Sequence, residues 1–116
     1  MQRQSIARWI LVAGLVFVFG YFGVDKFLNP LDWIGWIPDW IDGMMGTSKN
    51  IWLQIIGGSE ILFAAMLLIP VRNLQRAASI LMALHLLGVL TQVGWNDVAV
   101  RDIGILIADI ALLFLL

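Results

Sequence analysis

The sequence predicts an all-α integral membrane protein, a four-transmembrane-helix bundle with an interfacial helical loop between helices 1 and 2. Of its 116 residues, 61% are hydrophobic and 13% are charged, and the mean hydropathy is +0.93. Soluble domains average roughly 45–50% apolar and about 25% charged residues. The apolar residues also fall into runs close to the roughly 20 residues that cross a bilayer. The length allows a single membrane domain, residues 1–116.

The first span is predicted over residues 6–26, around the apolar run from Ile6 to Val24. A helix over that run is about 28 Å long, close to the thickness of the hydrocarbon core. A cleaved signal peptide is the competing interpretation. The run is longer than the apolar core of a usual signal peptide, and no small-residue cleavage site follows it, so we expect a retained span.

Three further spans are predicted over residues 51–69, 77–95 and 98–116. Pro70 closes the second span, because proline cannot continue a helix. A polar turn from Val71 to Arg76 leads into the third. The last apolar stretch is too short to cross by itself, so the fourth span must include Arg101 and Asp102 in its outer turn.

The distribution of arginine predicts the orientation of the bundle. Arg3 and Arg8 lie at the start of the first span, and Arg72 and Arg76 lie between the second and third spans. Short cytoplasmic segments carry an excess of Lys and Arg, so we expect both termini to be cytoplasmic. The other side holds three cations among a larger number of aspartates: Lys26, Lys49 and Arg101, with Asp25, Asp32, Asp39, Asp42, Asp97 and Asp102.

The connection over residues 29–50 is long and rich in tryptophan. Trp33, Trp36 and Trp40 recur at helical spacing, and Asn29-Pro30 resembles a helix start. Pro38 should divide the segment into two short helical turns. We interpret it as a re-entrant or interfacial helix pair, which is either an aromatic membrane anchor or a hydrophobic lid or partner-docking face.

Three ionisable residues fall near the middle of the predicted spans. Glu60, His85 and Asp109 each lie roughly 12–15 Å from the outer face, on three different helices. Because charged groups are costly in hydrocarbon, we expect them to face one another as a polar layer near the midplane. Gly57 and Ala64 share the stripe of Glu60, so this face should meet a neighbouring helix closely. The layer is either a quinone or proton site or a set of structural interhelical hydrogen bonds.

No metal site is predicted. The chain has one histidine and no cysteine, which excludes disulfides, thiolate nucleophiles and cysteine-ligated clusters. It also lacks the paired Glu-x-x-His motifs of di-iron bundles. A bis-histidine haem is excluded because it needs two imidazoles.

Adjacent opposite charges occur at the outer ends of the first and fourth spans. Asp25-Lys26 closes one span and Arg101-Asp102 opens the other. Neighbouring residues of a helix point about 100° apart, so we expect the pairs to form across helices, Lys26 with Asp102 and Asp25 with Arg101. The alternatives are ordinary interfacial charges, or an anion site built from Lys26 and Arg101.

Three segments resemble the DoxX family of small membrane proteins: GYFGVDKFLNP, IGGSEILFAAMLLIP and VRDIGILIADIALLFLL. The matching features are a glycine before a lysine, a Gly-x-x-Glu and an Arg-Asp, here Gly23 and Lys26, Gly57 and Glu60, and Arg101 and Asp102. The resemblance implies a four-helix protein of a prokaryotic plasma membrane. The family includes the small subunit of thiosulfate:quinone oxidoreductase, so the resemblance also implies quinone and respiratory chemistry.

These observations predict an accessory or structural subunit of a membrane oxidoreductase or respiratory complex that is not catalytic on its own. We expect no covalent cofactor, contact with quinone or lipid, and other membrane or redox subunits as partners. Nucleic acid is not expected, because the net charge is -1 and no basic tract is present. The alternatives are a small proton-coupled transporter, through the Glu60, His85 and Asp109 layer, and a plain membrane scaffold or assembly subunit.

Overall fold

The computed structural model describes residues 2–116, and these contain helices but no strands. The all-helical prediction is therefore confirmed. The elements in chain order are α1 (Arg3–Leu28), α2 (Pro30–Ile34), η1 (Asp39–Ile41), η2 (Met44–Gly46), α3 (Lys49–Leu68), α4 (Arg72–Val93) and α5 (Asp97–Leu115).

Three helices, α1, α3 and α4, are long and apolar enough to cross a membrane. They have 26, 20 and 22 residues. The helix α5 has 19 residues, about 28 Å of helix, but it carries Arg101, Asp102 and Asp109. Length and composition thus support a membrane protein with three apolar spanning helices.

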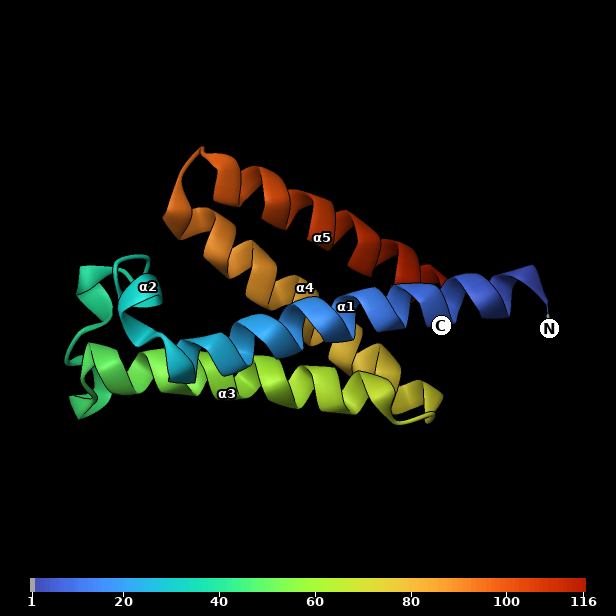
Figure 1. Cartoon of the computed structure of the whole chain (residues 1–116), viewed down its shortest axis with the longest axis horizontal. Helices are drawn as coiled ribbons and strands as arrows, with labels where there is room; N and C mark the ends of the chain where they lie inside the picture. The colour runs from blue at the N-terminus through green and yellow to red at the C-terminus, as the bar shows by residue number, and fades with distance from the viewer. Residues whose placement is uncertain (1) are drawn as a thin grey trace.

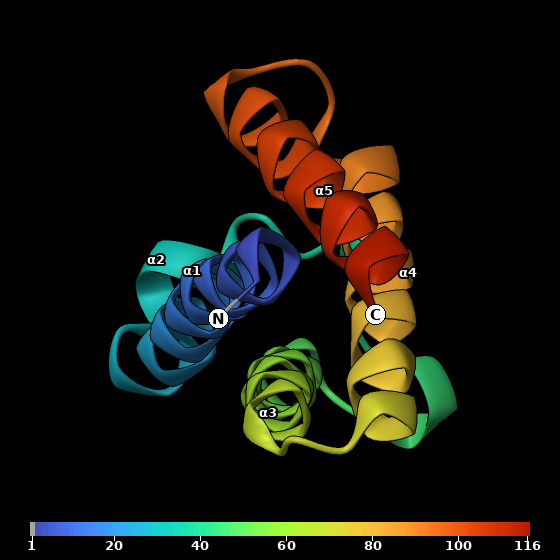
Figure 2. The ribbon, with the colours of Figure 1, turned by 90° about the vertical axis from the view of Figure 1, so that its right-hand side faces the viewer.

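The four long helices form two pairs. In Figure 1, α1 runs beside α3, and α4 runs beside α5. The pairs diverge toward the end of the bundle that holds α2, and they converge toward the end where both chain termini lie. We call these two ends the α2 end and the termini end. Figure 2, viewed from the termini end, shows the helices around a shared axis.

An apolar core fills the bundle where the pairs converge. Its residues recur every three or four positions along each helix, as helix packing requires. They are Val12, Leu15 and Phe19 of α1, Ala64 and Leu67 of α3, Ala78, Met82 and Leu86 of α4, and Leu112 and Leu116 at the end of α5. The outward faces are also apolar, with Phe17 72% and Phe114 88% exposed. Apolar side chains on both the inside and the outside suit a lipid environment.

The pair α1–α3 is closely packed at two glycines. A Cβ atom on Gly23 would lie 2.8 Å from the carbonyl oxygen of Gly57, and one on Gly57 would lie 3.0 Å from the carbonyl oxygen of Gly23. Real Cβ atoms do not approach backbone that closely, so the two helices can meet here only because both residues are glycine.

The junction between α3 and α4 corrects one boundary of the sequence prediction. Pro70 follows the end of α3, as expected, but α4 already begins at Arg72. The segment from Val71 to Arg76 is therefore mostly helix rather than a polar turn. Arg72, Leu74 and Arg76 are good helix formers. Gln75 is buried, and its amide donates to the carbonyl of Leu67 at 3.0 Å. This bond ties the new helix to the one before it.

The connection over residues 29–48 contains three short helical pieces rather than two. The helix α2 begins with Pro30 at its first position, and η1 follows directly after Pro38, so both prolines act as predicted. The side chain of Asn29 does not cap α2. Gly43 has a φ of 83°, which a glycine adopts without strain, and it opens the last piece, η2.

The end of this connection is attached to the start of α3. The backbone N–H of Lys49 donates to Asp42 at 2.9 Å, and the ammonium of Lys49 lies 2.9 Å from the carboxylate of Asp39. Hydrogen bonding from Lys49, together with its charge, holds the pKa of Asp39 below its ordinary value. Ser48 caps the helix by accepting from the N–H of Ile51 at 3.4 Å. These contacts connect the end of the loop to the start of α3.

Candidate functional site

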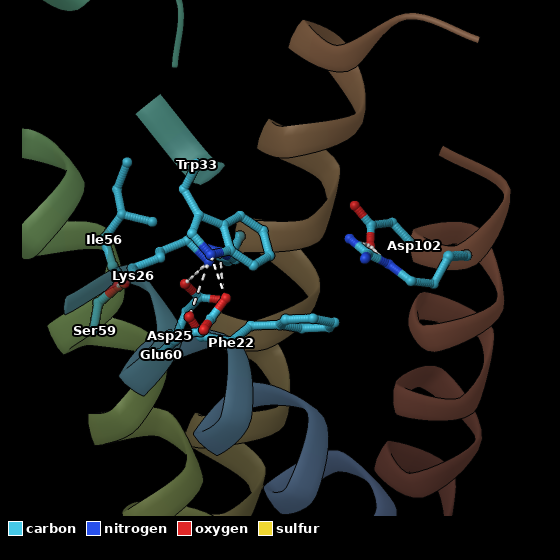
Figure 3. A network of polar contacts seen from close by, with 10 residues as sticks. Phe22, Asp25, Lys26, Trp33, Ile56, Ser59, Glu60 and Asp102 are labelled. Atoms are coloured by element: carbon cyan, nitrogen blue, oxygen red, sulfur yellow. Dashed lines mark hydrogen bonds and ion pairs between the residues drawn. The ribbon is translucent and has the colours of Figure 1, made fainter. Parts of the chain in front are cut away.

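A buried ion pair lies directly at the glycine contact. The ammonium of Lys26 on α1 is 2.6 Å from Oε1 of Glu60 on α3, and both residues are buried. The two helices are antiparallel (Figure 1), so Lys26 lies beside Gly57 on one side of the glycine contact and Glu60 lies on the other side, and their side chains reach each other along this close contact. Figure 3 shows both in the same cluster.

His85 of α4 is the third member of this cluster. Its Nε2 lies 3.8 Å from Oε2 of Glu60, so the carboxylate lies between an ammonium and an imidazole. Rings of Phe19 and Phe63 lie beside the imidazole, at centroid distances of 6.0 and 6.3 Å. The structure thus brings two residues of the predicted polar layer together and adds Lys26 to them.

Trp33 of α2 covers this cluster from the α2 end. Its indole N–H donates to Oδ2 of Asp25 at 2.7 Å, and Asn29 donates to Oδ1 of the same carboxylate at 2.6 Å. The ammonium of Lys26 lies 4.0 Å from the centre of the Trp33 ring, at cation–π distance. Asp25 therefore positions the indole over Lys26, as Figure 3 shows.

The charges of α5 pair differently from the prediction. Arg101 binds its own neighbour Asp102, with Nε donating to Oδ1 at 3.2 Å. Lys26 pairs with Glu60, and Asp25 accepts from neutral donors, so neither expected cross-helix pair forms among residues 2–116. The long arginine side chain can fold back along its helix, which the argument from helical angles neglects. The guanidinium instead lies 4.6 Å from the ring centre of Phe22 on α1.

A cavity of about 570 Å³ occupies the space where the helix pairs diverge. Its walls are largely apolar and come from all four long helices, including Val18, Phe19, Phe22, Ile56, Val89 and Ile105. Its polar lining includes Lys26, Glu60, His85, Gln92, Arg101 and Asp102. A largely apolar pocket with a few converging polar groups is the usual form of a small-molecule site.

The predicted interfacial aromatics contribute to this cavity. Trp33, Trp36 and Trp40 all line it, together with Pro38. The indole N–H of Trp40 donates to Oε1 of Gln92 on α4 at 3.2 Å, which connects the loop to the opposite helix pair. Of the two sequence interpretations, these contacts favour a lid, although the exposed edges of Trp36 and Trp40 also suit a membrane interface.

Asp109 lies apart from the cavity. Its carboxylate accepts a hydrogen bond from the hydroxyl of Ser79 on α4 at 2.8 Å, and its side chain is fully buried between α4 and α5. Its second oxygen, Oδ2, has no hydrogen-bond partner among residues 2–116. Ser79 precedes His85 by nearly two helical turns, so the three residues expected in one layer form two separate clusters.

No family model, curated protein or solved structure matches this chain. The resemblance to the DoxX family stays a prediction. The positions that carry that resemblance nevertheless lie together, because Gly23, Lys26, Gly57 and Glu60 form one contact and Arg101 and Asp102 line the same cavity.

Proposed function

We propose that the chain is a four-span accessory subunit of a membrane oxidoreductase, and that it holds a lipid-soluble quinone in the cavity at the α2 end. The single observation that carries the proposal is this cavity, with aromatic walls and the Lys26–Glu60–His85 cluster in its lining. DoxX-like membership and a prokaryotic plasma membrane belong to the same proposal.

The proposal makes α5 the fourth span. Its charged residues need not face lipid, because Asp102 and Asp109 are buried and Arg101 lies at the cavity. A helix whose ionisable groups face the bundle can cross a bilayer at modest cost. Both termini lie at one end of the bundle, and the arginines near them would place that end in the cytoplasm.

The residues of the cavity suit a quinone ring. A ring of this kind is apolar on its faces and offers carbonyl oxygens that accept hydrogen bonds. The aromatic walls would pack against the faces, and Lys26 or Arg101 would donate to a carbonyl. When bound, a quinone supplies electron and proton transfer, with the electrons exchanged with a partner subunit. Glu60 and His85 would hold or release protons at their carboxylate and imidazole groups.

Quinone binding by the purified protein tests the ligand. We expect quenching of tryptophan fluorescence on titration with decylubiquinone, because Trp33 and Trp40 line the cavity. Lys26→Met or Glu60→Gln should weaken binding by roughly 10–100-fold, the value of a charged hydrogen bond. Ser79→Ala is the matched control, since Ser79 is a buried polar residue away from the cavity, and its affinity should equal that of the wild type.

Purification in mild detergent tests the partner. We expect redox subunits to be recovered with the tagged protein and identified by mass spectrometry. A protein recovered alone and without affinity for quinone would contradict the proposal.

A proton-coupled transporter is the second candidate, favoured by the position of Glu60 between Lys26 and His85. That function requires proton flux into proteoliposomes that Glu60→Gln abolishes. If the protein is a plain scaffold, Lys26→Met and Glu60→Gln should alter only its stability. Flux without quinone binding would replace the first candidate with the transporter.

A further inference from the structure

The wall of the cavity between α1 and α3 is sealed. The two helices meet at Gly23 and Gly57 with no space for a side chain, and the Lys26–Glu60 ion pair crosses the same boundary at 2.6 Å. Opening this wall would break a buried ion pair, which is strongly unfavourable. A ligand cannot pass between these helices.

The wall at the α2 end is tethered on two sides. Trp33 is bonded to Asp25 on α1, and Trp40 is bonded to Gln92 on α4. The loop is also anchored to the start of α3 through Lys49. These contacts connect the lid to both helix pairs.

The wall between α1 and α5 is different. The two helices belong to different pairs, and these pairs diverge at this end (Figures 1 and 2). The ion pair of Arg101 is made with its own helix neighbour and does not connect α5 to α1. The contact that does cross is the guanidinium over the ring of Phe22, and cation–π contacts at exposed sites contribute only about 0.5–1 kcal/mol.

The exposure of its side chains indicates that the cavity opens at this wall. The side chain of Arg101 is 40% exposed, whereas that of its partner Asp102 is 7% exposed, although both line the cavity. The lining on either side of Arg101 is apolar, with Val18 on α1 and Val98 and Ile105 on α5. An apolar slot beside a partly exposed side chain suits a hydrocarbon chain.

We infer that the cavity opens to the lipid between α1 and α5, and that this slot is a binding subsite for the single isoprenoid or alkyl chain of the ligand. Phe22 and Arg101 close the slot in the free protein and separate when the chain enters. The inference rests on the proposed function, since it assigns the tail of the same ligand whose ring occupies the cavity.

Two quinones with the same ring test the subsite. Decylubiquinone carries an alkyl chain, and ubiquinone-0 carries none. At equal mole fraction in a nanodisc bilayer, we expect decylubiquinone to bind about tenfold more tightly, because the slot holds its chain. Equal affinity of the two quinones would overturn the subsite while leaving the ring site intact. Absence of binding by both would overturn the proposed function itself.

Cross-linking tests the route. The chain has no native cysteine, so a Phe22→Cys/Arg101→Cys variant carries the only two thiols. A short bis-thiol reagent with a reducible link should slow association of decylubiquinone by about tenfold or more, since the chain can no longer pass between the helices. Reduction of the link in the same sample should restore the rate, and each single-cysteine variant treated with the reagent is the matched control.

A cross-linked protein that binds decylubiquinone as fast as the reduced one would overturn the route. Phe22→Ala is a second, milder variant, which leaves Arg101 in place and removes only the ring. It should raise both the association and the dissociation rates several-fold. Unchanged rates in this variant would also contradict the inference.

Discussion

The two ends of the bundle hold their buried ionisable side chains in different surroundings. Both bury ionisable side chains among the four long helices. At the termini end, the Asp109–Ser79 pair lies in a packed apolar core. At the α2 end, Lys26, Glu60 and His85 border a cavity of about 570 Å³ under a tryptophan lid.

The difference shows that buried charges of one helical bundle can lie in unlike surroundings. Asp109 meets a hydroxyl donor and no cavity, so its arrangement suits a bond between α4 and α5. Glu60 meets two basic groups and lines a space that a ligand can occupy. Access, rather than burial, separates the two clusters.

The largest loss of stability is expected when one partner of the Lys26–Glu60 pair is removed. Lys26→Met leaves the carboxylate of Glu60 buried without its ammonium, and should lower the free energy of unfolding by about 3–5 kcal/mol. The double variant Lys26→Met/Glu60→Leu should recover much of that loss. Thermal or denaturant unfolding in detergent measures both. Arg101→Met, at a more exposed pair, should cost less than about 1 kcal/mol.

The glycine contact should give the next largest effect. Gly23→Ala places a Cβ 2.8 Å from a backbone oxygen, so we expect a loss of about 1–3 kcal/mol and weaker quinone binding, because α1 and α3 must separate. Gly20→Ala on the same helix is the matched control, since no atom lies within 4 Å of its added Cβ. Equal unfolding midpoints for the two variants would show that the contact does not hold the helices together.

Removing the Ser79–Asp109 hydrogen bond should cause a smaller loss of stability and should not change ligand binding. Ser79→Ala deletes the donor to Asp109, and interhelical hydrogen bonds in membranes contribute about 0.6 kcal/mol on average. We expect a small loss of stability and unchanged quinone affinity, measured on the same samples. A large loss of affinity would remove the contrast between the two ends.

The smallest effect concerns the anchor of the lid. The pKa of Asp39 lies below its ordinary value because of Lys49, so this contact contributes fully above about pH 3.8 and is lost as the pH falls through the lowered pKa. We expect the loop to become more accessible to an acid-active protease in that range. The variant Lys49→Gln should show the same accessibility at higher pH, with no further change on acidification.

Several parts of the site follow from local sequence. The apolar runs predict α1, α3 and α4, the three helices long and apolar enough to cross a membrane, and Pro30, Pro38 and Pro70 mark boundaries because proline has a fixed φ and no N–H. The Gly-x-x-Lys and Gly-x-x-Glu spacings also held the signal for the ion pair that the sequence analysis missed. Where two antiparallel helices meet at glycines, long side chains on either side of the contact can reach each other along it.

Other parts depend on distances between helices. Their similar depth along each helix predicted that Glu60, His85 and Asp109 lie in one layer. Depth, however, does not determine which faces of the helices contact one another. The divergence of the two pairs separates Asp109 from the other two and creates the cavity. Likewise, the reach of the Arg101 side chain to Asp102 and Phe22 depends on its rotamer and on the position of α1.

The sequence by itself determined that the chain is helical, with three segments long and apolar enough to cross a membrane and with ionisable residues inside such segments, because hydropathy and helix period are properties of single segments. Only the tertiary structure decided which charges meet and which of them a ligand can reach. The physical reason is that an ion pair forms over a few ångströms between residues far apart in the chain, and those distances are set by how the helices cross.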